Sequence, residues 1–163
     1  MKKRSVALFA MCFFALCSLS LGAVIYVPDN FPTIQDAIDG AVGGDVIMVR
    51  AGTYVENIDL RGKAIPLTGI PAWRTVIDGD MAGNGIHIAS GEGPDTVVQG
   101  LAVTRGYSPT GGGVLVVNSS PTLRNLVVAD NESSDEGGGL YIEGGNPTLD
   151  GLWILDNYTR VDG

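Results

Sequence analysis

The pattern of apolar and polar positions repeats along the second half of the chain. Apolar runs at residues 114–117 and 123–129 are separated by turn-forming residues, and the same order returns at 140–142 and 149–155. A constant offset, which takes Gly111 to Gly137, leaves nine positions unchanged, namely Gly111, Gly112, Gly113, Pro121, Thr122, Leu123, Leu126, Asp130 and Asn131. Self-similarity at a fixed period of this length marks a solenoid, a propeller or an array.

The composition of each repeat predicts strands. Short runs of β-branched and aliphatic residues bounded by Gly, Pro, Asn and Ser are typical of strands. No repeat holds a segment long enough for a crossover helix, the Gly triplets oppose a helical repeat, and a propeller blade needs roughly 40 residues or more. We therefore predict an all-β, parallel β-helix of about five turns, in which the residue at position n lies over the one at n + 26. Leu123 would then lie over Leu149, and Asn131 over Asn157 in a hydrogen-bonded amide ladder.

The segment before the repeats predicts a cap. Residues 24–27 form a first short strand, and residues 33–41 form an amphipathic helix with Thr33 as its N-cap. A strand at 46–49 follows. An open solenoid end exposes core side chains and strand edges, so we expect the helix to cover the first turn.

Three runs in this region carry a family resemblance: residues 33–38, 44–49 and 52–57. They resemble the N-terminal region of the pectin-lyase-like superfamily, in particular pectin methylesterases and secreted bacterial right-handed parallel β-helix repeat proteins. Arg50-Ala51 stands where Lys-Pro is usual. The resemblance implies a right-handed parallel β-helix with one short N-terminal capping helix. The catalytic aspartates of the esterases, and the calcium-binding acids and arginine base of the pectate lyases, lie on later turns, so no catalytic residue is carried over, Arg105 and Arg124 included.

The first 23 residues predict a secretory signal peptide. Three basic residues at positions 2–4 precede an apolar run over 6–21 and small residues at 22–23. The alternatives are an uncleaved membrane anchor, for which the run is short, and a lipid anchor on Cys17, which the bulky Leu16 opposes. We divide the chain into the signal peptide (1–23), the cap with the first turn (24–58) and further turns (59–163). Because Gly163 falls one full period after Gly137 and no C-terminal cap is visible, we expect a truncated solenoid or one that another chain completes.

Charge narrows the range of partners. Three of the ten basic residues lie at positions 2–4, so seven basic and 18 acidic side chains remain from residue 24 onward, a net charge of −11. This balance disfavours binding to nucleic acid and insertion into or binding to anionic membranes. It also disfavours an acidic polysaccharide, unless a divalent cation bridges the two.

Three groups of side chains could carry chemistry. Asp130 over Asp156, with Glu132, Asp135 and Glu136 in the adjoining loop, could bind calcium, although a solvated turn with an Asn ladder explains the same residues. Asp78 and Asp80 could form half of a glycosidase pair, or an ordinary Asp-Gly turn. His87, the one histidine, could be a surface general base, or an exposed strand residue without a partner nearby in the sequence.

We favour a secreted or cell-surface β-helix scaffold that binds extended carbohydrate and has no catalytic site in this sequence. The alternative is the N-terminal part of a polysaccharide lyase or a carbohydrate esterase or hydrolase, whose site lies on turns beyond this sequence. We assign no catalytic, cofactor or metal residue, with calcium as the one cofactor hypothesis. Exposed strand edges at the uncapped end predict self-association.

Overall fold

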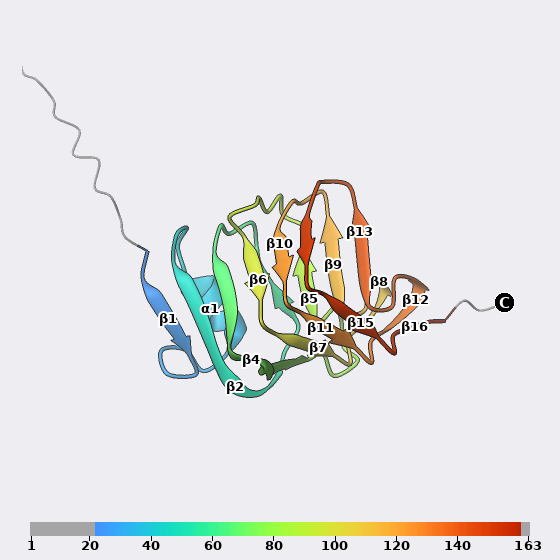
Figure 1. The fold of residues 1–163 in the computed structure, drawn as a ribbon, viewed down its shortest axis with the longest axis horizontal. Coiled ribbons are helices and arrows are strands. Elements are labelled where there is room, and N and C mark those ends of the chain that lie inside the picture. The colour runs from blue at the N-terminus through green and yellow to red at the C-terminus, as the bar shows by residue number, and fades with distance from the viewer. Residues whose placement is uncertain (1–21, 161–163) are drawn as a thin grey trace, which may run out of the picture.

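The computed structural model describes residues 22–160 and confirms a parallel β-helix of about five turns with one short helix (Figure 1). All paired strands in it are parallel. The helix is α1 (Ile34–Gly40). The strands are β1 (Val24–Val27), β2 (Val46–Val55), β3 (Ile58–Asp59), β4 (Pro66–Asp78), β5 (Ile86–Ile88), β6 (Val97–Gln99), β7 (Ala102–Thr104), β8 (Tyr107–Thr110), β9 (Val114–Val117), β10 (Thr122–Arg124), β11 (Val127–Ala129), β12 (Glu132–Glu136), β13 (Leu140–Glu143), β14 (Thr148–Asp150), β15 (Trp153–Leu155) and β16 (Tyr158–Thr159).

The strands stack into three faces. The nine-stranded sheet supplies two of them, because the long strands β2 and β4 run along one face and then continue into the next. The first face holds β1, the first halves of β2 and β4, then β6, β10 and β14; the second face holds the second halves of β2 and β4, then β7, β11 and β15. The third face is the four-stranded sheet of β3, β5, β9 and β13, and β8, β12 and β16 form a short extra sheet.

The predicted period holds between the last two turns. Leu123 pairs with Leu149, and Val127 pairs with Trp153. Earlier turns differ: β4 and β6 pair at a longer spacing, with Leu67 opposite Val98, and β6 and β10 pair one position short of the period, with Val98 opposite Leu123. The loops between the faces differ in length from turn to turn. The strands therefore stay paired although the early turns do not have a constant number of residues.

Left-handed backbone conformations make the corners. Gly100, Asn125 and Gly151 have φ of 67°, 48° and 64° and occupy one corner in successive turns. Within the Gly triplets, Gly111 and Gly137 both have φ of 62°. A Cβ on Gly112, the next residue of the first triplet, would lie 2.0 Å from the Glu132 carbonyl oxygen, so this position needs glycine for close backbone approach.

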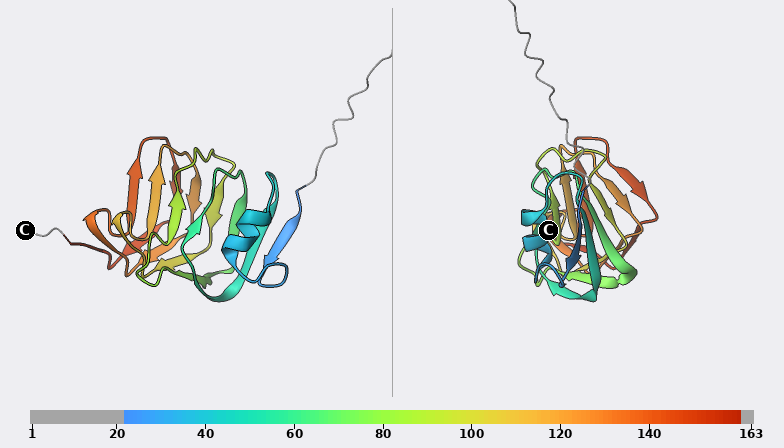
Figure 2. Two further views of the ribbon diagram at one scale, coloured as in Figure 1. Left: turned by 180° about the vertical axis from the view of Figure 1, so that it is seen from behind. Right: turned by 90° about the vertical axis from the view of Figure 1, so that its left-hand side faces the viewer.

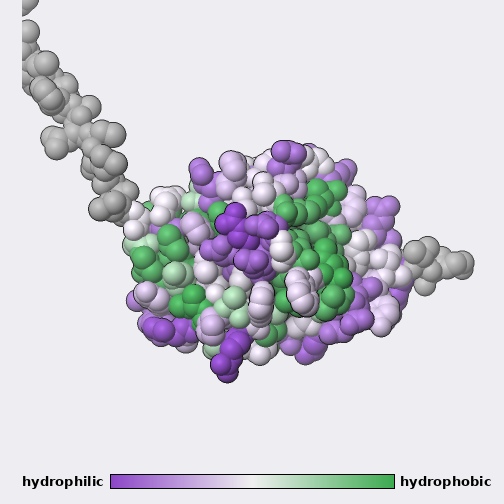
Figure 3. All heavy atoms as spheres, viewed as in Figure 1, coloured by the Kyte–Doolittle hydropathy of each residue, from purple (hydrophilic) through white to green (hydrophobic). Residues whose placement is uncertain are grey.

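Aliphatic columns fill the coil. On the first face Leu67, Val98 and Leu123 are fully buried, whereas Leu149, the next residue of the column, is 46% exposed. Ile154, which follows buried Val128 on the second face, is 47% exposed. Figure 3 shows the resulting apolar surface around β14. The core is therefore continuous along the stack and open over the last described turn.

Helix α1 closes the other end of the coil, where Figure 2 shows it beside β1. Thr33 is the N-cap and accepts a hydrogen bond from the Asp36 amide, as predicted. The helix buries Ile34, Ala37 and Ile38 against the core. Its seven residues are too few to cross a bilayer, and no other described segment forms a helix long and apolar enough to do so.

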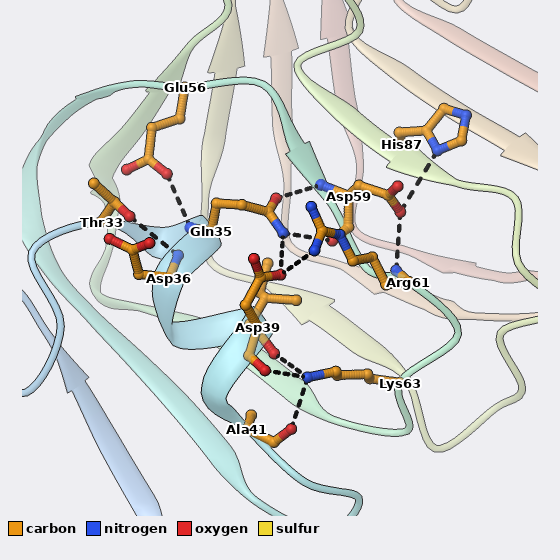
Figure 4. Close-up of polar contacts among 11 residues, drawn as sticks. Thr33, Gln35, Asp36, Asp39, Ala41, Glu56, Asp59, Arg61, Lys63 and His87 are labelled. Atoms are coloured by element: carbon orange, nitrogen blue, oxygen red, sulfur yellow. Dashed lines mark hydrogen bonds and ion pairs between the residues drawn. The ribbon is translucent and has the colours of Figure 1, made fainter.

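Polar side chains tie α1 to the coil (Figure 4). The Gln35 amide pairs with the backbone of Asp59 in β3, accepting from its N–H at 2.8 Å and donating to its carbonyl at 3.3 Å. A side chain thus takes the place of a neighbouring strand at the edge of the third face. The Glu56 carboxylate accepts hydrogen bonds from two amides in the first turn of the helix, and the Lys63 ammonium donates to three carbonyls at its end.

Candidate functional site

Both tryptophans of the chain line one hollow on the second face. The hollow measures about 140 Å³ and is lined by Trp73, Val127 and Trp153. Trp153 and Val127 belong to an outward-facing column, because their sequence neighbours Ile154 and Val128 point into the core. The two indole side chains are 54% and 62% exposed, an unusual degree of exposure for such large apolar groups.

Trp73 reaches this site across two turns. It lies between the two halves of β4, in a left-handed conformation with φ of 64°. Its amide donates to the carbonyl of Gly100 in the next turn, and its indole Nε1 donates to the carbonyl of Asn125 in the turn after that, at 3.1 Å. The backbone strain and the indole hydrogen bond together hold the ring against the coil surface and leave its outer side open to solvent.

A charged pair lies at the same corner. Arg124, which directly precedes Asn125, donates through Nε to Asp150 Oδ2 at 3.1 Å in the next turn. Both side chains are exposed. The site therefore offers an apolar floor on the second face and polar groups on the adjoining edge of the first face, a combination that suits a ligand with one apolar and several polar surfaces.

Sequence reasoning did not assign a role to either tryptophan. The alternation around Trp153 shows that it faces opposite to Ile154, which was the available signal for exposure. The sequence does not predict that Trp73 lies near Trp153, because the two residues are several turns apart in the chain and the early turns have irregular lengths. The chain has two tryptophans, and only the fold shows that both lie at one site.

The predicted Asn ladder is present at the corner after the second face. Asn131 is fully buried, and its Oδ1 accepts from the Gly106 amide at 2.9 Å. Its Nδ2 donates to Val103 O, Ala129 O and Asn157 Oδ1 at 2.9–3.0 Å. Asn131 thus joins three consecutive turns and satisfies backbone groups that the corner leaves unpaired.

The acidic column beside this ladder has left-handed corners at Asp130 and Asp156, with φ of 55° and 50°. Glu132 forms an ion pair with Arg160. Within residues 22–160 no group of three or more His, Cys, Asp or Glu side chains is arranged to hold a metal ion. Calcium binding at Asp130 and Asp156 stays a prediction.

Arg105 joins the two carboxylates proposed as half of a glycosidase pair. It donates to Asp78 Oδ2 at 3.0 Å and to Asp80 Oδ1 at 2.6 Å. Asp78 also accepts the amide of Asp80 at 3.0 Å, as an Asp-Gly turn predicts. One guanidinium therefore neutralises both acids on the same side of the coil, a geometry that stabilises a corner.

His87 has a partner that the sequence did not suggest. Its Nδ1 lies 3.6 Å from Asp59 Oδ1, because β3 and β5 pair with these two residues in register (Figure 4). The same Asp59 oxygen accepts the amide of Arg61 at 2.9 Å, and Arg61 forms an ion pair with Asp39 of α1. The histidine is part of the polar network that joins the cap to the third face.

Two acidic side chains serve as hydrogen-bond acceptors for irregular backbone. Glu92 is 2% exposed and accepts from the amides of Gly62 and Ser90, each at 2.8 Å, and from Ser119 Oγ at 2.9 Å. Burial by itself raises the pKa of Glu92, but these hydrogen bonds outweigh burial and hold the pKa below its ordinary value of 4.5. Hydrogen bonds from the amides of Val42 and Ala23 likewise lower the pKa of Asp45.

Comparison with known proteins gives a match to a plant protein. A protein of Arabidopsis thaliana described as a "Probable pectinesterase/pectinesterase inhibitor 17" is 41% identical over 58 residues. The match spans 34% of this chain, and the chain covers only 11% of the plant protein. No family model matches the chain. No solved structure matches it either. The plant match and the observed coil together support a pectin-lyase-like β-helix.

Proposed function

We propose that this protein is an extracellular β-helix scaffold that binds carbohydrate at the Trp73–Trp153 hollow. The observation that carries the proposal is the meeting of both tryptophans in one exposed hollow with an apolar lining. A sugar ring has a face of C–H groups that stacks on an aromatic ring, while its hydroxyls need polar neighbours or water. The predicted signal peptide at residues 1–23, of which residues 1–21 lie outside the described residues, and the similarity to a plant pectinesterase support an extracellular location.

The coil suits this role because it holds the site without help from flexible segments. Val127 and Trp153 lie on paired strands, and Trp73 is fixed through hydrogen bonds to two later turns. Ligand binding then requires little ordering of the protein, which preserves the free energy gained from stacking. A row of parallel strands also presents a surface along which an extended chain can lie.

Affinity electrophoresis tests the proposal. The purified protein is run through gels that contain soluble cellulose derivatives, xylan, glucomannan or pectin, alongside Trp73→Ala and Trp153→Ala. Retardation of the wild type by at least one polysaccharide, and its loss in both variants, is the expected result. Tyr158→Ala is the matched control, because Tyr158 is 65% exposed and lies on β16, in a different sheet. Migration that no polysaccharide alters would refute the proposal.

The match to the plant pectinesterase favours a second candidate, part of an enzyme that acts on pectin. We assign no catalytic residue for it, and the carboxylates of Asp78, Asp80 and Glu132 lie in ion pairs with arginines. Release of methanol from methylated pectin by the purified chain would favour this candidate, and release of unsaturated sugars would favour a lyase. Binding without either reaction favours the scaffold.

A further inference from the structure

The lining of the hollow restricts the kind of sugar that it accepts, an inference that rests on the proposed carbohydrate-binding function. We infer that the Trp73–Trp153 hollow takes the apolar face of an uncharged pyranose ring in preference to a uronate. The lining residues Trp73, Val127 and Trp153 carry no charge. A carboxylate placed against these three side chains would lose water without gaining a counter-ion, which is costly, whereas an uncharged ring keeps its hydroxyls at the rim.

The arginines that could neutralise a uronate are mostly paired with the protein's own carboxylates. The pairs within residues 22–160 are Arg50 with Asp29, Arg61 with Asp39, Arg105 with Asp78 and Asp80, Arg124 with Asp150, and Arg160 with Glu132. Arg74 is the remaining described arginine and follows Trp73 in sequence. It is exposed and does not line the hollow, so a solvent-screened contact is the most it can contribute.

The net negative charge of the whole chain also disfavours binding of a uronate. Acidic residues outnumber basic ones by 18 to 10, so the field of the protein repels a polyanion at low ionic strength. The hollow is small, about 140 Å³, and its three lining side chains are apolar and uncharged. An uncharged glycan therefore suits the electrostatics of the site.

Intrinsic fluorescence reports directly on this site, since both tryptophans of the chain line it. The wild type is titrated with cellohexaose, xylohexaose, mannohexaose and hexagalacturonate, with a chelator present, at low and at physiological salt. We expect saturable changes with at least one uncharged hexasaccharide and affinity for hexagalacturonate lower by roughly tenfold or more. Calorimetry should show binding lost in Trp73→Ala and Trp153→Ala and kept in Tyr158→Ala and Arg74→Gln.

The other outcomes separate this inference from the proposed function. In one such outcome, hexagalacturonate binds more tightly than every uncharged glycan, and its binding depends on both tryptophans and weakens in Arg74→Gln. This result would overturn the preference for an uncharged sugar and leave carbohydrate binding at the hollow intact. Binding of an uncharged glycan that survives both tryptophan substitutions would overturn the hollow as the site. The absence of binding to all four probes, together with unaltered electrophoresis, would overturn both proposals.

Discussion

Replacing Glu92 by Gln tests how the irregular loops of the coil are held together. The Glu92 carboxylate accepts hydrogen bonds from Gly62, Ser90 and Ser119, which lie at the same corner of three successive turns. Gln has nearly the same shape but presents an NH₂ group where one carboxylate oxygen accepts. At least one buried N–H or O–H then meets a donor, and the charge that strengthens the remaining bonds is lost.

The expected cost is about 1.5 to 3 kcal/mol, the range for a hydrogen bond to a charged group. That is a large part of the roughly 5 to 15 kcal/mol that stabilises an ordinary domain. In urea it lowers the unfolding midpoint by about 1 M if the denaturant slope is about 2 to 3 kcal/mol/M. Asp95→Asn is the control, because Asp95 is exposed in the same loop and the substitution removes the same charge.

The effect of Glu92→Gln should also depend on pH. Because the folded-state pKa of Glu92 lies below its unfolded value, the stabilisation is complete above about pH 4.5 and is lost as the pH falls through the lower, folded-state pKa. The difference in unfolding free energy between wild type and variant should therefore shrink from pH 7 toward pH 3. A variant as stable as Asp95→Asn at pH 7, or a difference that does not change with pH, would refute the reasoning.

Three further predictions concern the ladder, the acidic column and the open end. Asn131→Ala should lower the free energy of unfolding by about 3 kcal/mol or more, because buried backbone groups lose their partners, whereas Asn157→Ala should cost less since Asn157 is only partly buried. If Asp130 and Asp156 bind calcium, excess calcium after chelation should raise the melting temperature, and Asp156→Asn should remove the increase; an unchanged melting temperature would exclude the site. Sedimentation velocity should show concentration-dependent association that Leu149→Asp abolishes, and a compact monomer at all concentrations would contradict it.

The sequence was most informative where the repeat is regular. The columns through Leu123 and Asn131 could be placed from the constant period alone, because stacked strands put equivalent residues in register. The capping helix was equally predictable, since its apolar stripe and N-cap are local features. Local chemistry and strict periodicity are the two kinds of information that a single sequence carries directly.

The contacts between irregular turns could not be predicted. His87 meets Asp59 of the preceding turn, and Trp73 contacts Asn125 two turns further on, at spacings set by loops whose lengths follow no period. Glu92 has no sequence signal that marks it as buried, because its partners are backbone amides brought together by the fold. The candidate site was missed for the same reason: its residues come from turns that differ in length.

The tryptophans and the aliphatic residues of the last turn are exposed for different reasons. Leu149 and Ile154 occupy core columns, and their counterparts one turn earlier, Leu123 and Val128, are fully buried. A further turn of coil, from whichever source, would bury them in the same way. An outward-facing residue stays partly exposed even when a further turn stacks beside it. Val127 is the example, because it is only partly buried although Trp153 of the next turn pairs with it. Covering the open end should therefore leave the hollow accessible, so a substitution such as Leu149→Asp should change self-association without changing carbohydrate binding. A loss of both together would show that the hollow forms part of the association surface.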